Sequence, residues 1–219
     1  MEARSMMTLK QFNEHVLKGK SVAELYDLIE DFKIEIVFLK LQIEKENIAT
    51  FTLPPAEMMS KINSYRLYIK DTYKLIEKIA GMIERADDEA FAIQFQENLS
   101  NIQKVDYQIG GYFEGIEEYH LTFEDDQVVV TNSNSHEESS VAVKIDKEPF
   151  LKEFADLHMG EWRESYSDSD YGEQIMDGTS WSVNVHFTNK IGLIQFGGSN
   201  SFPYNFGTFN KLIMKSFNK

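Results

Sequence analysis

Residues 21–46 read SVAELYDLIEDFKIEIVFLKLQIEKE and predict a long amphipathic helix. Six apolar residues in this stretch are spaced alternately four and three apart: Leu25, Ile29, Phe32, Ile36, Leu39 and Ile43. This spacing is the heptad repeat of a helix that packs along another helix. Four further apolar residues lie off this seam and widen the apolar face: Leu28, Val37, Phe38 and Leu41. We therefore expect the helix to contact more than one neighbour.

A second heptad seam lies in the helix predicted at about 55–85. Its apolar positions are Ile62, Tyr65, Ile69, Ile76, Ile79 and Ile83, interrupted by Thr72. A short segment with two prolines, 49–55, separates the two helices. Two seams of matching length joined by a short loop predict an antiparallel helical hairpin. Alternatively, one seam forms a coiled coil between chains and makes a homo-oligomer.

Shorter helices are expected on both sides of this hairpin. Capping boxes at Thr8 and Ser21, each with Gln or Glu three residues later, predict helix starts. The first helix spans about 8–18 and ends before Gly19, a residue suited to a left-handed helix end. Residues 87–104 predict a fourth helix, with Asp87 as its N-terminal cap. Its inward-facing residues are Phe91, Phe95, Leu99 and Ile102.

From residue 105 the pattern changes to alternation of polar and apolar residues, which is typical of half-buried strands. Strands are predicted at 118–124, 127–131, 141–145, 181–187 and 191–196. A short helix after Asp146 and a last helix at about 206–217 carry apolar faces. Antiparallel strands with two helices on one face predict an α+β fold. We therefore expect a helical, coiled-coil-like domain at 1–104 and an acidic α+β domain at 105–219.

The acidic residues are concentrated in the second half of the chain. The whole chain has 36 acidic and 22 basic residues, a net charge of −14, and residues 114–177 alone hold 18 acidic against 4 basic residues. A protein with this excess of negative charge repels duplex nucleic acid and anionic lipid, because both are negatively charged and bind Lys and Arg. It favours a basic protein as partner.

The sequence lacks signals for export or membrane insertion. No window approaches 18 consecutive apolar residues, and the first twelve residues lack the apolar core of a secretory signal. The absence of cysteine excludes disulfides, thiolate catalysis and iron–sulfur clusters. We expect a cytoplasmic protein.

Two short motifs flank the last predicted strand pair. They are DGTSW at 177–181 and GSNSFP at 198–203, and an amphipathic helix follows them. Together they resemble small α+β domains of uncharacterised proteins from Gram-positive bacteria and their mobile elements. The stretch IGGYF at 109–113 is similar to an early strand of such domains. The resemblance covers 105–219 and rests on turn and core residues, so it implies a fold and no activity.

No stretch matches a catalytic or metal-binding motif. Asp168 and Asp170 begin a run like a calcium loop, but Gly172 stands at position 5 instead of 6, and position 12 is Thr179 instead of Glu. The five histidines show no metal-ligand spacing, and there is no G-x-S-x-G elbow. We expect no catalytic residue, metal or cofactor. The less favoured alternative is an enzyme with an unrecognised carboxylate site built from Asp168, Asp170, His158 and Glu161.

These observations favour a non-catalytic, acidic protein-binding protein. It would act as an inhibitor or immunity factor that neutralises a basic nucleic-acid-handling protein, as in phage anti-defence or toxin neutralisation. The alternative is an oligomeric structural or assembly module built on the helical hairpin. The acidic residues expected to contact a partner are Glu117, Glu118, Glu124, Asp125, Asp126, Asp168 and Asp170.

Overall fold

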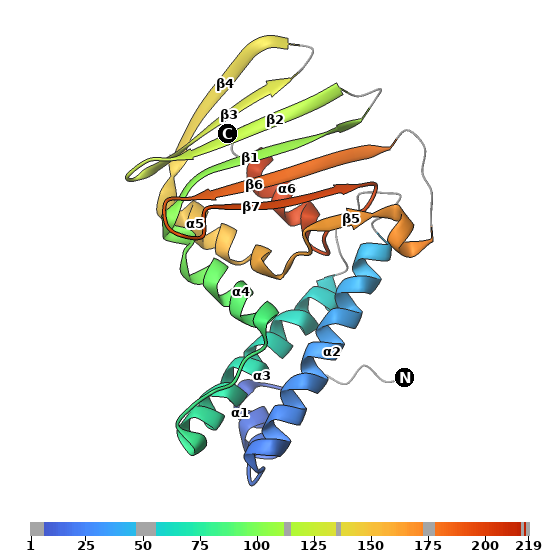
Figure 1. Ribbon diagram of the computed structural model, residues 1–219, viewed down its shortest axis with the longest axis vertical. Coiled ribbons are helices and arrows are strands. Elements are labelled where there is room, and N and C mark those ends of the chain that lie inside the picture. The colour runs from blue at the N-terminus through green and yellow to red at the C-terminus, as the bar shows by residue number, and fades with distance from the viewer. Residues whose placement is uncertain are drawn as a thin grey trace. The chain divides into compact units, whose positions relative to one another are not determined.

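The computed structural model describes residues 7–46, 56–111, 115–134, 137–172, 178–215 and 217. The chain forms two compact units: Met1–Ile43 with Pro54–Arg85, and Glu44–Leu53 with Ala86–Lys219. The first unit is helical and the second contains a sheet covered by helices (Figure 1). The predicted α+β class is therefore confirmed.

The helical hairpin is confirmed and is antiparallel. Its helices are α2 (Val22–Glu46) and α3 (Ala56–Ala80). Tyr26 near the start of α2 contacts Tyr73 near the end of α3, whereas Phe32 further along α2 stacks on the earlier Tyr65 of α3. Pairs that run in opposite order along two helices define an antiparallel arrangement.

Buried apolar side chains hold this unit together. Leu25 and Ile29 of α2 pack with Tyr73 and Ile76 of α3 in one cluster. Phe12 of α1 (Leu9–Phe12) joins the cluster by stacking on Tyr68, with ring centroids 4.2 Å apart. A turn of π-helix, η1 (Asn13–Leu17), continues α1, so the two elements together occupy the helix predicted at 8–18.

The predicted capping boxes form at both helix starts. The Thr8 hydroxyl accepts from the backbone N–H of Gln11, and the Gln11 side chain accepts from the backbone N–H of Thr8. Ser21 and Glu24 make the same reciprocal pair. Gly19 has a φ of 81°, the left-handed conformation expected of it.

Several predicted apolar residues are more exposed than the heptad pattern indicates. Ile79, next to the last residue of α3, is exposed, although Ile76 before it is buried and Ile83 after it is partly buried against the cluster. Of the four off-seam residues, Leu28 is partly buried against the cluster, as expected. Val37, Phe38 and Leu41 are exposed and lack the cover expected for them among the described residues. The other predicted seam residues are buried or partly buried.

The sheet of the second unit has seven strands in the order β4-β3-β2-β1-β6-β7-β5. The first five neighbouring pairs are antiparallel, and only β5 pairs parallel, with β7. The strands are β1 (Ile102–Gly111), β2 (Gly115–Phe123), β3 (Gln127–Asn134), β4 (Glu137–Asp146), β5 (Ser165–Ser167), β6 (Thr179–Phe187) and β7 (Leu193–Ser199). The predicted hairpin of β6 and β7 is confirmed.

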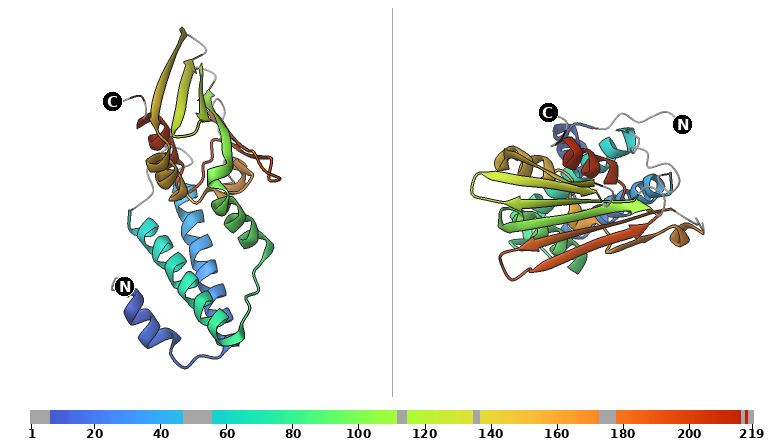
Figure 2. Two further views of the ribbon diagram at one scale, coloured as in Figure 1. Left: turned by 90° about the vertical axis from the view of Figure 1, so that its left-hand side faces the viewer. Right: turned by 90° about the horizontal axis from the view of Figure 1, so that it is seen from above.

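Two helices, α5 (Lys147–Ala155) and α6 (Phe206–Lys215), lie on the same side of the sheet (Figures 1 and 2). Tyr107 of β1 shows how this side is packed: it stacks on Tyr119 and donates a hydrogen bond to Asn210 of α6 at 3.0 Å. Trp162 follows a short turn, η3 (Met159–Glu161), and fills the same core beside Phe206 and Phe209.

The helix predicted at 87–104 is shorter in the structure. α4 spans Asp87–Glu97, a 3-10 turn η2 (Leu99–Asn101) follows it, and 102–104 belong to β1. Its N-cap is Ala86 without a side-chain hydrogen bond, and Phe91 is exposed. Phe95 packs on Phe187 and Phe196 of the sheet. Residues 86–101 therefore belong to the compact unit that contains the sheet, on which α4 packs through Phe95.

The two motifs behind the family resemblance serve close packing. A Cβ on Gly178 would meet the Asn200 side chain, and a Cβ on Gly198 would meet the Trp181 indole at 2.6 Å. The Trp181 indole N–H donates to the backbone oxygen of Ser201 at 2.8 Å. These residues of the two motifs therefore shape turns and the core of the fold.

Candidate protein-binding surface

The β2–β3 turn presents the most exposed of the predicted acidic residues. Glu124, Asp125 and Asp126 are all exposed and consecutive. The backbone N–H of Glu124 donates to the oxygen of Gln127 at 2.9 Å, which closes the turn. Three carboxylates are therefore presented together at the end of a hairpin.

Lys147, the first residue of α5, fixes this turn in place. Its backbone N–H donates to the oxygen of Asp126 at 3.0 Å, and its ammonium donates to the backbone oxygen of Glu124 at 2.9 Å. Lys144 approaches the Glu124 carboxylate at 3.8 Å, but both side chains are more than half exposed, so this pair contributes little. Asp146 and Glu148 add exposed carboxylates beside the turn. We call these five carboxylates, Glu124, Asp125, Asp126, Asp146 and Glu148, the acidic turn surface.

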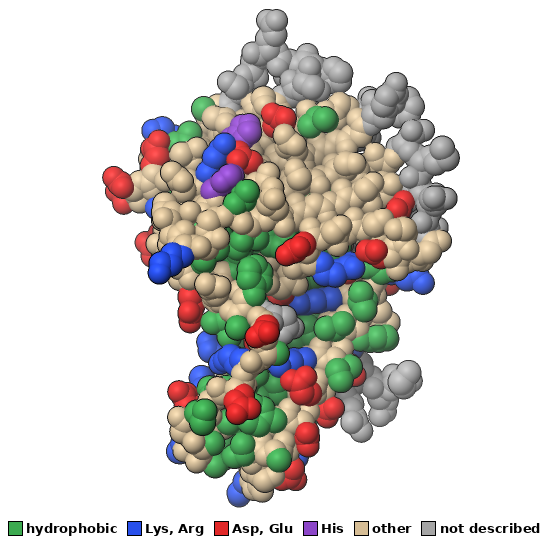
Figure 3. All heavy atoms as spheres, viewed as in Figure 1, with side chains coloured by type: hydrophobic (Ala, Val, Ile, Leu, Met, Phe, Trp, Pro, Cys, Tyr) green, Lys and Arg blue, Asp and Glu red, His purple; other side chains and the backbone are tan. Residues whose placement is uncertain are grey.

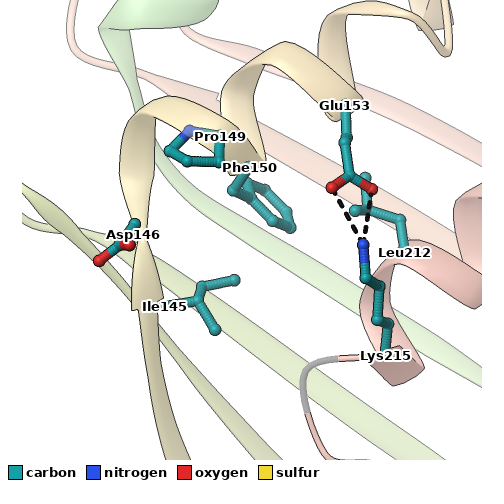
Figure 4. A pocket seen from close by; sticks show the side chains of 7 residues that line it. All are labelled: Ile145, Asp146, Pro149, Phe150, Glu153, Leu212 and Lys215. Atoms are coloured by element: carbon teal, nitrogen blue, oxygen red, sulfur yellow. Dashed lines mark hydrogen bonds and ion pairs between the residues drawn. The ribbon is translucent and has the colours of Figure 1, made fainter. Parts of the chain in front are cut away.

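A small apolar pocket of about 110 Å³ lies next to this surface (Figure 4). Its rim includes Asp146 and, on another side, the ion pair in which the Lys215 ammonium lies 3.0 Å from Glu153. The pocket is smaller than the roughly 300–1,000 Å³ of typical small-molecule sites, so one side chain of a partner fits it better than a cofactor does. It is lined by Ile145, Asp146, Pro149, Phe150, Glu153, Leu212 and Lys215.

Glu117 and Glu118 lie toward the other end of β2. Glu117 accepts a hydrogen bond from the Tyr119 hydroxyl at 2.7 Å, and Glu118 accepts one from Gln108 at 2.8 Å. Because successive residues of a strand point to opposite faces, these two carboxylates do not share a face. At about 3.3 Å per residue, six or seven residues separate them from the turn by roughly 20 Å.

Asp168 and Asp170 are held by contacts within the chain. Asp168 is only 9% exposed, and its carboxylate accepts from the backbone N–H of Ser169 and the side chain of Asn200. Asp170 caps the backbone N–H of Ser167 and lies 3.3 Å from the Arg163 guanidinium. The seven predicted carboxylates thus fall into three separate groups, and only Glu124, Asp125 and Asp126 form one exposed group.

A cluster that the sequence did not reveal lies on the sheet face opposite α5 and α6. Val105 and Tyr107 of β1 face the core, so Lys104 and Asp106 face the other way. His120 Nδ1 lies 2.5 Å from one oxygen of Asp106, and His186 Nε2 lies 3.1 Å from the other. Lys104 Nζ lies 2.8 Å from Asp106 as well. Figure 3 shows histidine, basic and acidic side chains together on this side of the sheet.

These contacts keep Asp106 charged. Partial burial alone raises the pKa of its carboxyl, but hydrogen bonds from Lys104 and His120 and their charges outweigh burial, so the pKa lies below the ordinary value of Asp. The period-two pattern placed both histidines on polar strand faces. It could not show that β1 lies between their strands, because that pairing joins residues 80 positions apart.

Neither a metal site nor a catalytic constellation is evident in the described part of the chain. Within it, no group of three or more His, Asp or Glu side chains is placed to hold a metal ion. His158 and Glu161 of the enzyme alternative lie 3.9 Å apart, whereas the Asp168 carboxylate contacts Asn200 and Ser169. Among the helices that the structure describes, none is both long and apolar enough to cross a membrane.

Comparison of the chain with protein-family models, with curated proteins and with solved structures gives no match. A functional proposal for this protein therefore rests on the residues and geometry described above.

Proposed function

We propose that this protein is a non-catalytic binding protein that neutralises a basic, nucleic-acid-handling protein through the acidic turn surface. The observation that carries the proposal is the group of three exposed, consecutive carboxylates held on a hairpin by Lys147. Carboxylates fixed before binding lose little conformational entropy on association, which favours affinity. Complementary charge also accelerates the encounter with a basic partner.

The neighbouring pocket supports a protein partner over a simple cation. Binding energy in protein interfaces is concentrated in a few side chains that fill pockets, and charged groups at the rim add specificity. An apolar or aromatic side chain of the partner would enter between Phe150 and Leu212 while its basic residues meet the acidic turn surface. Cytoplasmic action and an inhibitor or immunity role are part of this proposal.

The test compares charge reversal at the turn with the same reversal elsewhere. The wild-type protein is used to capture proteins from a host lysate at about 0.05 M salt, and those lost at about 0.5 M are isolated and titrated singly. Glu124→Lys, Asp125→Lys and Asp126→Lys together should weaken binding of the basic partner by at least about tenfold. The control combines Glu57→Lys, Glu77→Lys and Glu84→Lys, exposed positions on the other unit, and changes net charge equally.

Two outcomes contradict the proposal. Equal weakening by both triple variants would mean that overall charge, not the acidic turn surface, determines binding. Capture of no basic protein whose binding is salt-sensitive would remove the basis for a neutralising role.

A further inference from the structure

An exposed apolar stripe runs along α2 on the side opposite its buried seam. It consists of Ile34, Val37, Phe38 and Leu41, each between 41% and 65% exposed. Their spacing of three, four and seven residues places them on one helix face. Ile29 and Ile36, half a turn away, are buried. We call these four residues the α2 stripe.

Charges at the two ends of the same helix face have opposite signs. Glu30 and Asp31 lie one turn before the stripe, and Lys45 lies one turn after it; all three are exposed. Glu30 also pairs with Lys33 within the helix at 2.8 Å, whereas Asp31 extends the negative end. The face therefore runs from negative through apolar to positive.

We propose that the α2 stripe binds the α2 stripe of a second copy of this chain, with the two helices antiparallel about a two-fold axis near residues 37 and 38. In this arrangement Ile34 lies against Leu41 of the second copy, and Val37 lies against Phe38. Asp31 and Glu30 then meet Lys45 of the second copy at both ends. A parallel pairing would instead place Asp31 against Asp31 and Lys45 against Lys45, which costs free energy.

The two-fold pairing is isologous, so the assembly closes at a dimer. Four apolar side chains on each helix give an interface smaller than the roughly 800 Å² per partner of a standard protein complex. We therefore expect a weak dimer, with a dissociation constant of about 10 µM to 1 mM. The proposal concerns α2 and does not depend on the acidic turn surface.

Sedimentation velocity of the full chain tests the dimer, from about 1 µM to about 1 mM. The weight-average mass of the wild type should rise with concentration, to at least about 1.5 times the monomer mass at the high end. Phe38→Ser should weaken association by about tenfold or more, because it removes the largest side chain of the stripe. The matched control is Leu67→Ser on α3, a position 49% exposed with Asn63, Ser64, Lys70 and Asp71 as helix neighbours. It should leave association unchanged.

Charge exchange tests the antiparallel orientation. Asp31→Lys alone and Lys45→Glu alone should each weaken association by about threefold, because each places like charges together. The double variant should associate more tightly than either single variant, because it restores the opposite-sign pair between positions 31 and 45 while Glu30 still faces a like charge. Far-UV circular dichroism and melting temperature confirm that each variant is folded; all of the substituted residues are exposed.

A chain that stays monomeric at about 1 mM, or a dimer that Phe38→Ser leaves intact, overturns the proposal. A dimer weakened equally by Leu67→Ser overturns it as well. Failure of the double charge variant to associate more tightly than either single variant rules out the antiparallel pairing.

Discussion

Asp106 is the residue at which strand order creates an electrostatic cluster. Its two carboxylate oxygens contact His120, His186 and Lys104 from three adjacent strands. Alternation of polar and apolar residues along the strands predicts that His120 and His186 lie on the polar faces of their strands. Only the pairing of β1 with both β2 and β6 brings them to a common carboxylate. The cluster therefore contributes to the stability of the sheet in a way that depends on pH.

Asp106→Asn should destabilise the protein by about 1 kcal/mol at pH 7, because it removes the charged hydrogen-bond acceptor. The pKa of Asp106 is lowered in the folded state, so its stabilising contribution is present above the ordinary pKa of Asp and is lost as pH falls through the folded pKa. The difference between the variant and wild type should thus shrink in acid. Urea unfolding at pH 7 and at about pH 3 measures it.

Glu118→Gln is the control for this prediction, because Glu118 of β2 lies on the same face of the sheet as His120 and its side chain is more exposed than that of Asp106. It should change stability by less than about 0.5 kcal/mol at either pH. A loss that is equal at both pH values in Asp106→Asn would show that the carboxylate charge is not what stabilises the cluster.

The second helix, α2, is apolar on two opposite faces, and only one of them is buried. The heptad spacing of Ile29 and Ile36 correctly predicts the buried face. The width of the apolar surface predicts a second neighbour, but Val37 and Phe38 remain exposed. Periodicity shows that a face can pack. It does not show whether the occupant belongs to the same chain, because both cases bury the same apolar area.

Ile29→Ala should lower the free energy of unfolding by about 2–5 kcal/mol, because it leaves a cavity in the packed cluster. Ile34→Ala, the same change on the exposed face of α2, should lower it by less than about 0.5 kcal/mol. Chemical denaturation followed by circular dichroism, at a concentration where the chain is monomeric, compares the two. Similar losses would mean that the α2 stripe is covered within the monomer.

The whole molecule consists of two units with different folding requirements. The helical unit is built mainly from the hairpin of α2 and α3, which follow one another in the chain, and α1 adds to it through Phe12 and Tyr68. The sheet places β6 beside β1, although β2 to β5, α5 and two short 3-10 turns separate them in the chain. Contacts of low sequence separation form with a smaller loss of chain entropy than contacts of high separation. The two units should therefore open as separate cooperative units.

Native-state hydrogen exchange tests this separation. Ile29→Ala should accelerate exchange of the amides in α2 and α3 and leave unchanged those of Val105 in β1 and Val185 in β6, which are fully buried in the central strands. Uniform acceleration across both units would show instead that the chain opens as a single cooperative unit.

The sequence by itself determines the local features of this protein. Heptad spacing specifies the helical hairpin, capping boxes specify the helix starts at Thr8 and Ser21, and alternation specifies β2, β6 and β7. The concentration of acidic residues in 114–177 is likewise a property of the sequence alone. All of these signals arise from residues within one helix turn, one strand or one contiguous segment.

Only the tertiary structure decides how those local features combine. It assigns α4 to the sheet unit through Phe95, brings Asp106 between two histidines, and leaves Phe38 without a cover among the described residues. It also separates Asp168, which is held by Asn200, from the carboxylates of the β2–β3 turn. Non-local strand pairing and competition for buried positions set these outcomes, because the free energy of a contact depends on which distant segment occupies the neighbouring space.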